Sequence, residues 1–358
     1  MSPKFVIFDC DGGSDDAWAL VFLLKAEEEK RLVILGVTIC GSGNTSLHNA
    51  ARNMLRILKA SGRDEVIPIF LGATEALIPP ASRQNNEERH LFHGIDGFGD
   101  VLPADTEIDI EEMVEGEIFK HFQNPQQVTV ISVGPLTNIA LCYSMYSDQF
   151  ANNVKEIYIM GGNHQGVGNC TRSAEFNFYS DPEAAYIVLS KSKCPITILP
   201  WEPCMNERFF ISIDWRLDVF GCQAAQLSPA IQLLNEVERA QWAPTDFKSW
   251  NPCDAMLVAA FLFGEHFIRK ETKWHATVDL KGSHTRGQMV LDHLHEEKKY
   301  PKNVCIIEFI TLYNATLKLF KNKLFLFLQL FIITLTASIP KCCQVRYEYL
   351  CCEIRYYK

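Results

Sequence analysis

The sequence lacks the features that mark several classes of protein. Its 358 residues carry 34 Lys or Arg against 43 Asp or Glu, a net charge of −9, and no run of basic residues occurs. Nucleic-acid-binding proteins usually have such a run, so we expect a small-molecule partner and no nucleic acid. The opening MSPKFVIFDCD enters an apolar run without a secretory signal pattern ahead of it, which predicts a cytoplasmic protein.

The cysteines lack any regular spacing. There are 13 of them, with no CxxC pair and no Cys/His spacing typical of zinc. This pattern favours reduced thiols over a disulfide framework or a zinc site. Internal repeats and low-complexity linkers are also missing, so the sequence predicts one domain over residues 1–309 and a separate tail over 310–358.

The tail differs in composition from everything before it. Residues 324–339 form a run without charged residues. This run is slightly shorter than the roughly 18 apolar residues of a membrane-spanning helix. Three interpretations are open: a membrane anchor, a buried helix, or a divergent terminus outside the fold. We favour the third, because the closing CCQVRYEYLCCEIRYYK follows neither a helical nor a strand period. Membrane contact is expected only if the uncharged run is an anchor.

Apolar runs and helical patterns alternate along the first 309 residues. The runs that read as buried strands are Phe5–Phe8, Leu32–Thr38, Val66–Phe70, Val128–Val133, Ile157–Met160 and Ile196–Leu199. After Asn44 the apolar residues recur every three or four positions, and SDPEAAYIVL places an N-cap Asp181 before Pro182. The alternation predicts an α/β fold, an open doubly wound, mostly parallel sheet flanked by helices. Ligands of such sheets bind beyond the carboxyl ends of the strands.

Four carboxylates follow the first predicted strand. FDCDGGSDDAWAL contains Asp9, Asp11, Asp15 and Asp16, separated by a Gly-Gly turn. The last two open a helix, where exposed amides favour negative charge. Helix capping would explain one or two acids, but four of them after a buried strand indicate a functional site. Oxygen ligands without His or Cys suit a hard cation, Ca²⁺ or Mg²⁺.

Five ordered motifs resemble a known family. DCDGGSDDAWAL, GVTICGSGNTSLHNAARN, SVGPLTNIA, IMGGNHQGVGNCTRSAEFNFYSDPEAA and NPCDAM, between about residues 4 and 309, are similar to those of the nucleoside hydrolases, the inosine-uridine-preferring nucleoside N-ribohydrolases. The resemblance implies a Ca²⁺-dependent nucleosidase that hydrolyses the N-glycosidic bond of ribonucleosides to ribose and a free base. It implies a homo-oligomer too, because family members are commonly dimers or tetramers.

The resemblance also assigns roles to matched positions. It implies that Ca²⁺ is bound by the carboxylates of Asp11, Asp16 and Asp254 and by the carbonyl of Val133. It further implies that Asp11 is the general base for the attacking water and that the sugar passes through an oxocarbenium-like state. The implied ribose-binding residues are Asp15, Asn44, Asn169, Glu175 and Asn177. Asn169 has the alternative of an ordinary turn residue.

The acid that would protonate the leaving base is left open. The best-studied branch of the family has His-Asp where this chain has Cys253-Asp254, which is similar to animal-type members. Cys253 is a candidate weak acid, although we favour simple packing under the pocket. His93 is another candidate, in the segment LFHGIDGFGD that resembles the family's lid loop. The aromatic residues that could instead stack on the base are Trp242, Trp250 and Phe178, which by residue type belong in the core.

Two other functions compete with this interpretation. FDCDGG begins like the nucleophile motif of haloacid-dehalogenase-type phosphatases, but Gly13 stands where that family has Thr or Val, and a later GDxxxD motif is missing. The other candidate is a nucleoside-binding protein that has lost turnover, an idea suggested by the divergent tail.

Overall fold

The chain was analysed as a computed structural model, which describes residues 3–79, 92–102, 127–205, 211–222, 228–243 and 245–310. The strands of the main sheet are β1 (Lys4–Cys10), β2 (Leu32–Ile39), β3 (Ile69–Leu71), β4 (Val128–Ser132), β5 (Val154–Met160), β6 (Ile196–Leu199), β7 (Ile268–Trp274) and β10 (Val304–Ile310). A small second sheet pairs β8 (Ala276–Val278) with β9 (Met289–Leu291) in antiparallel fashion.

The main sheet has the strand order β3-β2-β1-β4-β5-β6-β10-β7. All of its pairs are parallel except β10 with β7. The order reverses between β1 and β4, and such a reversal is where open α/β sheets bind ligands. The predicted α/β class with a mostly parallel sheet is therefore confirmed.

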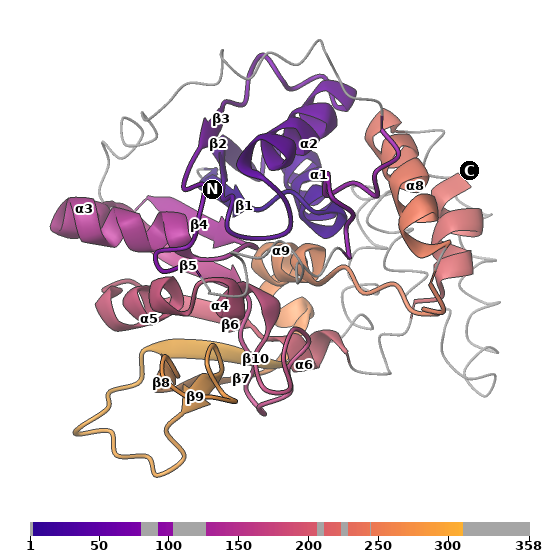
Figure 1. Ribbon diagram of the computed structural model, residues 1–358. Coiled ribbons are helices and arrows are strands. Elements are labelled where there is room, and N and C mark those ends of the chain that lie inside the picture. The colour runs from indigo at the N-terminus through magenta and orange to yellow at the C-terminus, as the bar shows by residue number, and fades with distance from the viewer. Residues whose placement is uncertain are drawn as a thin grey trace.

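Helices cover both faces of the sheet. The helical segments are α1 (Ser14–Glu28), α2 (Leu47–Ala60), α3 (Thr137–Asn153), α4 (Phe176–Ser180), α5 (Pro182–Lys191), α6 (Trp201–Cys204), η4 (Trp215–Phe220), α8 (Pro229–Trp242), α9 (Cys253–Phe263) and η5 (Gly264–His266). The core on one face is shared by α1, α2, α8 and α9, and the core on the other by α3, α5 and the small sheet. Figure 1 shows α9 beside the centre of the sheet and α8 outside α1 and α2.

Local signals predicted several helix starts correctly. Asp181 is the N-cap of α5, and its carboxylate accepts a hydrogen bond of 3.0 Å from the Ala184 N–H. The face predicted after Asn44 lies on α2, but the capping residue is Ser46, whose hydroxyl accepts from the Asn49 N–H.

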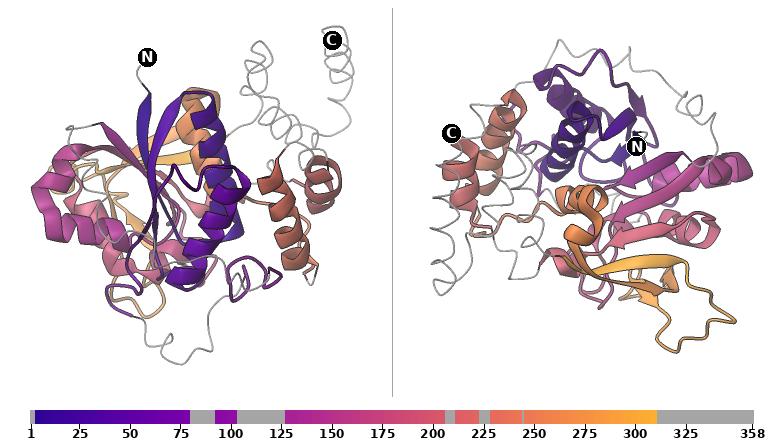
Figure 2. Two further views of the ribbon diagram at one scale, coloured as in Figure 1. Left: turned by 90° about the horizontal axis from the view of Figure 1, so that it is seen from above. Right: turned by 180° about the vertical axis from the view of Figure 1, so that it is seen from behind.

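One sequence-based expectation needs correction. The strand predicted over Val66–Phe70 begins only at Ile69, because Val66 belongs to a turn in which its N–H donates to the Arg63 carbonyl. The final strand β10 ends at Ile310, next to the boundary predicted at about residue 309, and pairs with both β6 and β7. The views from above and behind in Figure 2 show β10 within the sheet.

The tail beyond Ile310 lies outside the described residues, including the uncharged run at 324–339. In the part of the chain that the structure describes, no helix is both long and apolar enough to span a membrane. The nine cysteines of the described ranges are all free thiols, as the sequence predicted. The cytoplasmic location stays a prediction.

Candidate functional site

The first functional segment is the turn between β1 and α1. Gly12 has a φ of 80°, a backbone conformation that residues other than glycine rarely adopt. A Cβ at this position would lie 2.3 Å from the Ala50 Cα. The turn is closed by the Asp16 carboxylate, which accepts hydrogen bonds from the backbone N–H groups of Asp11 (3.0 Å) and Gly13 (2.8 Å). These contacts aim the acidic residues of the turn at the carboxyl edge of the sheet.

Three carboxylates from two helices meet at this edge. One oxygen each of Asp15, Asp16 and Asp254 lies within 4.8 Å of the others. The first two stand in the first turn of α1 and the third in the first turn of α9, so the positive ends of two helix dipoles face the cluster. The sequence had predicted that Asp16 and Asp254 come together across the chain, and the structure brings them together.

Burial makes the charged form of these carboxylates unfavourable. Asp16 is 0% exposed and Asp254 is 3% exposed. Burial raises the pKa of Asp16 well above its usual range, and the charges of Asp11 and Asp15 add to the rise. The pKa of Asp254 is likewise raised by burial and by its three acidic neighbours. A divalent cation would offset this repulsion.

The donor set fits a hard divalent cation. Asp15 Oδ1 is buried and accepts no hydrogen bond from the described residues; its nearest partner is His93 Nε2, an ion-pair contact of 3.4 Å. Carboxylate oxygens from two helices are typical ligands of Ca²⁺, which tolerates irregular geometry. The residues present therefore fit the ion that the resemblance implied.

Asp11 lies beside the cluster. Its carboxylate accepts hydrogen bonds from Asn44, one from the backbone N–H (2.7 Å) and one from the side-chain amide (3.1 Å). Burial raises the pKa of Asp11 to about 7, which suits a group that accepts a proton near neutral pH. The backbone packs closely around it, since a Cβ on Gly43 would lie 1.7 Å from Asp11 Oδ2. Its role as a metal ligand stays a prediction.

Val133 and Asn177 contact each other at the carboxyl edge of the sheet. Asn177 is buried and its amide donates hydrogen bonds to the carbonyls of Val133 (2.9 Å) and Met160 (3.1 Å). These carbonyls follow or end β4 and β5 at the carboxyl edge of the sheet. The structure thus links two residues that the resemblance had placed in different roles, the Val133 carbonyl on the ion and Asn177 on the ribose.

Glu175 is held rigidly at the start of α4. It is 1% exposed, and its carboxylate accepts from the backbone N–H groups of Gly162 (2.7 Å), Asn177 (2.9 Å) and Phe178 (3.2 Å). Burial raises the pKa of Glu175 to about 7 although these hydrogen bonds favour the charged form. Asn169 is exposed, and its side-chain carbonyl accepts from the Phe176 N–H (2.8 Å) at the start of α4.

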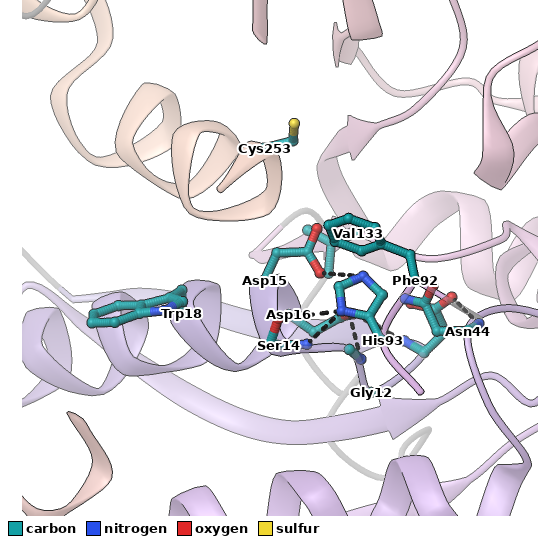
Figure 3. A network of polar contacts seen from close by, with 12 residues as sticks. Gly12, Ser14, Asp15, Asp16, Trp18, Asn44, Phe92, His93, Val133 and Cys253 are labelled. Atoms are coloured by element: carbon teal, nitrogen blue, oxygen red, sulfur yellow. Dashed lines mark hydrogen bonds and ion pairs between the residues drawn. The ribbon is translucent and has the colours of Figure 1, made fainter. Parts of the chain in front are cut away.

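His93 reaches the cluster from the loop at 92–100. Its Nε2 lies 3.4 Å from Asp15 Oδ1, and its Nδ1 accepts from the Ser14 N–H (3.3 Å). The Gln241 amide nitrogen lies 2.9 Å from the same Nδ1 (Figure 3 shows the contacts to Asp15 and Ser14). Because Nδ1 accepts, the proton of the neutral ring is on Nε2 and faces Asp15. Burial lowers the pKa of His93, with Asp15 opposing.

Cys253 begins α9 and is 4% exposed. Its thiol donates to the Asn251 carbonyl at 3.4 Å, and Figure 3 shows the sulfur pointing away from the Asp15 carboxylate. A hydrogen bond with the Cys204 thiol, followed by burial, raises the pKa of Cys253 well above its usual range. These contacts are those of a packed core thiol.

The three aromatic candidates for base stacking lie in the core. Phe178 is 0% exposed and lies over Gly161 and Gly162. Trp250 is 2% exposed and its indole N–H donates to Glu238 at 2.9 Å. Trp242 is 9% exposed at the end of α8. Residue type predicted that these rings belong to the core, and their burial fits that prediction better than it fits stacking on the base.

Sequence reasoning missed the supporting residues of the site. Ser14 and Gln241 hold His93, and the Ser14 hydroxyl donates to the Gln241 carbonyl at 3.0 Å. Asp9, counted among the four acids, instead accepts from Thr38, Asn138 and Ser132 and joins β1 to its neighbours. The sequence carried a signal for this role of Asp9. The residue continues a buried parallel strand, so its side chain points into the layer of covering helices.

The fold and the acidic site at the reversal of strand order together describe an α/β protein with a candidate divalent-cation site, and comparison with known proteins gives the family. The signature described as "Inosine-uridine preferring nucleoside hydrolase" matches residues 6–314. The chain belongs to this family. It is therefore a hydrolase that acts on nucleosides, and the phosphatase alternative loses its basis.

Several relatives support the assignment. The chain is 31% identical over 292 residues to the "Pyrimidine-specific ribonucleoside hydrolase RihA" of Shewanella woodyi, covering 80% of this chain and 88% of that protein. It is 36% identical to the "Probable uridine nucleosidase 1" of Oryza sativa subsp. japonica, over 52% of this chain and 55% of that protein. The solved structure of an "Inosine-Guanosine Nucleoside Hydrolase (IG-NH)" superimposes with a TM-score of 0.72 at 26% identity, covering 86% of this chain and 94% of that chain.

Proposed function

We propose that the protein is a Ca²⁺-dependent ribonucleosidase that hydrolyses the N-glycosidic bond to give ribose and a free base. The observation that carries the proposal is the convergence of Asp15, Asp16 and Asp254, from two helix N-termini, with one carboxylate oxygen of each within 4.8 Å of the others. When bound there, Ca²⁺ would supply a Lewis acid that orients the sugar hydroxyls and lowers the pKa of a nearby water.

The remaining chemistry belongs to this chain's own residues. We propose that Asp11 accepts the proton of the attacking water, since its pKa of about 7 places the carboxylate near the point of proton exchange at neutral pH. The oxygen of that water bonds to the anomeric carbon as the bond to the base nitrogen breaks, and the bonding electrons leave with the base. Positive charge develops on the sugar, and the surrounding carboxylates stabilise it electrostatically.

The ribose would be held between the two walls of the site. Asp15 and Asn44 lie on the α1 and β2 side, and Glu175 and Asn177 on the α4 side. Glu175 and Asn177 are fixed by backbone contacts, so a hydroxyl group would find them preorganised. We assign Asn169 a weaker role than the resemblance implied, because its side-chain carbonyl already caps Phe176.

Protonation of the departing base is a separate question. His93 presents Nε2–H toward Asp15 at the mouth of the acidic cluster, whereas the Cys253 thiol is engaged by Asn251 and Cys204. We therefore favour His93 over Cys253 as the residue that assists the leaving group.

Product analysis tests the proposed function. The full chain with Ca²⁺ is incubated separately with inosine, uridine, adenosine, guanosine and cytidine, and ribose and free base are measured. We expect equimolar ribose and base from at least one nucleoside. Nucleoside binding without product from any of them would instead support the binding-protein alternative.

A further inference from the structure

A buried ion pair lies behind the acidic cluster and plays no part in the chemistry above. Glu238 on α8 is 1% exposed and Arg216 on η4 is 0% exposed. Arg216 Nη2 lies 2.6 Å from Glu238 Oε2. Because removing two charges from water costs more than their attraction usually returns, such a pair is weak evidence for stability alone.

The other oxygen of Glu238 joins two tryptophans. Glu238 Oε1 accepts the indole N–H of Trp18 at 2.9 Å and the indole N–H of Trp250 at 2.9 Å. The two rings meet edge to face, with centroids 5.4 Å apart and planes at 74°. The Arg216 guanidinium lies over both rings, 4.6 Å from the Trp18 centroid and 5.2 Å from the Trp250 centroid.

These tryptophans belong to the two segments that supply the acidic cluster. Trp18 follows Asp16 by two residues on α1, and Trp250 precedes Asp254 by four residues at the approach to α9. One carboxylate oxygen therefore fixes the side chains of both segments at the same point. The distance between α1 and the start of α9 determines how far Asp16 lies from Asp254.

A second contact from the same helix strengthens this link. Gln241, one turn further along α8, accepts from the Ser14 hydroxyl at the first residue of α1. Helix α8 thus holds α1 at two points, below the acidic turn through Glu238 and beside it through Gln241. Ligand geometry within about 0.5 Å decides metal affinity, and residues behind the ligands commonly change it about 10- to 100-fold.

We propose that Glu238 is a positioning residue for the metal site: by accepting both indole N–H groups it sets the spacing of Asp16 and Asp254 and thereby the affinity for a divalent cation. Burial raises the pKa of Glu238, and the charge of Arg216 opposes this rise. This inference rests on the proposed function, in that the acidic cluster must bind Ca²⁺. It adds a residue that touches neither the cation nor the nucleoside.

The competing explanation is that Glu238 only stabilises the fold, so the test must separate metal affinity from stability. In the double variant Arg216→Met/Glu238→Met, the ion pair is replaced by apolar side chains of similar length, and the indole N–H groups of Trp18 and Trp250 lose their shared acceptor. In Trp250→Phe, the aromatic ring is kept and one N–H donor is lost. The control Glu183→Gln breaks a different Glu–Arg pair, the contact of Glu183 with Arg286 at 2.8 Å on the opposite face of the sheet.

The measurement is a Ca²⁺ titration of the cation-free full-length protein by calorimetry, together with its melting temperature. We expect the Kd for Ca²⁺ to rise about 10- to 100-fold in the double variant and several-fold in Trp250→Phe, and to stay at the wild-type value in Glu183→Gln. If the double variant does not fold, Trp250→Phe alone decides. A wild-type Kd in the folded variants would overturn the inference. A wild-type chain that binds no Ca²⁺ would overturn the proposed function as well.

Discussion

Asp16 on α1 and Asp254 on α9 present carboxylate oxygens within 4.8 Å of each other, although they lie far apart in the sequence. The strand order brings them together, because β1 is central in the sheet and α9 packs against α1 beside it. Both residues stand in the first turn of their helices, where the dipole tolerates negative charge. Their proximity defines the site.

Removal of one carboxylate should weaken cation binding more than it weakens the fold. For Asp254→Asn we expect the Kd for Ca²⁺ to rise by about 10-fold or more, because one charged ligand is lost. The Ca²⁺-free variant should melt at or above the wild-type temperature, since a repulsive buried charge has gone. Calorimetric titration and thermal unfolding measure the two effects, and a wild-type Kd would contradict the assignment.

Asp11→Ala should abolish turnover while the chain stays folded. The residue is proposed to accept the proton of the attacking water, and loss of a general base commonly costs about 10²- to 10⁴-fold in rate. The variant keeps Asp15, Asp16 and Asp254 but loses a predicted ligand, so it should bind Ca²⁺ more weakly than the wild type does. Ribose release and circular dichroism are the measurements. Turnover within a few-fold of wild type would exclude Asp11 as the base.

The stability of the Ca²⁺-free protein should fall as pH rises, and Ca²⁺ should stabilise the protein more at high pH than at low pH. The pKa of Asp11 is raised from 3.8 to about 7 in the folded protein, so between these pH values the folded chain holds a proton that the unfolded chain has lost. The stability of the Ca²⁺-free protein therefore falls as pH rises through this window. Ca²⁺ binds the charged carboxylates and releases protons.

The rise in melting temperature on adding Ca²⁺ should thus be larger at about pH 8 than at about pH 5. Differential scanning calorimetry at equal Ca²⁺ concentration measures it. An equal rise at both pH values would show that the buried acids do not titrate on cation binding.

Cys253→Ala and His93→Ala should have unequal effects. The Cys253 thiol is engaged by Asn251 and Cys204, so its loss should lower stability by about 1 kcal/mol and change kcat little. Loss of the His93 ring, which faces Asp15, should lower kcat by about 10²-fold. Steady-state kinetics with one nucleoside compares them. The opposite order of effects would move the leaving-group role to the thiol.

The sequence predicted those parts of the structure that depend on local patterns. Apolar runs and capping residues identified most central strands, α2 and α5, because burial and helix starts leave short-range signals. The start of β3 was misplaced since Val66 is apolar yet lies in a turn. The edge strand β7 was missed because it reads IRKETKW, a largely charged segment that pairs antiparallel with β10.

The site residues that belong to sequence motifs could be predicted. Those that join the site only through packing of the helices could not. The acidic turn and Asp254 were found from the motifs, yet the third carboxylate of the cluster belongs to Asp15, a residue expected to bind ribose. Glu238, Arg216 and Gln241 left no sequence signal, because a single Glu, Arg or Gln in a helical pattern is usually on the surface. Only the placement of α8 against α1 makes them part of the site.

The central claim is that the acids of α1 and α9 bind one cation that cleavage requires. The most direct test is ribose release from the best nucleoside substrate before chelation, after complete removal of divalent cations, and after Ca²⁺ is restored. The account predicts that turnover disappears on removal and returns with Ca²⁺ in the wild type, but does not return in Asp254→Asn at the same Ca²⁺ concentration. Full turnover in the cation-free protein would contradict it.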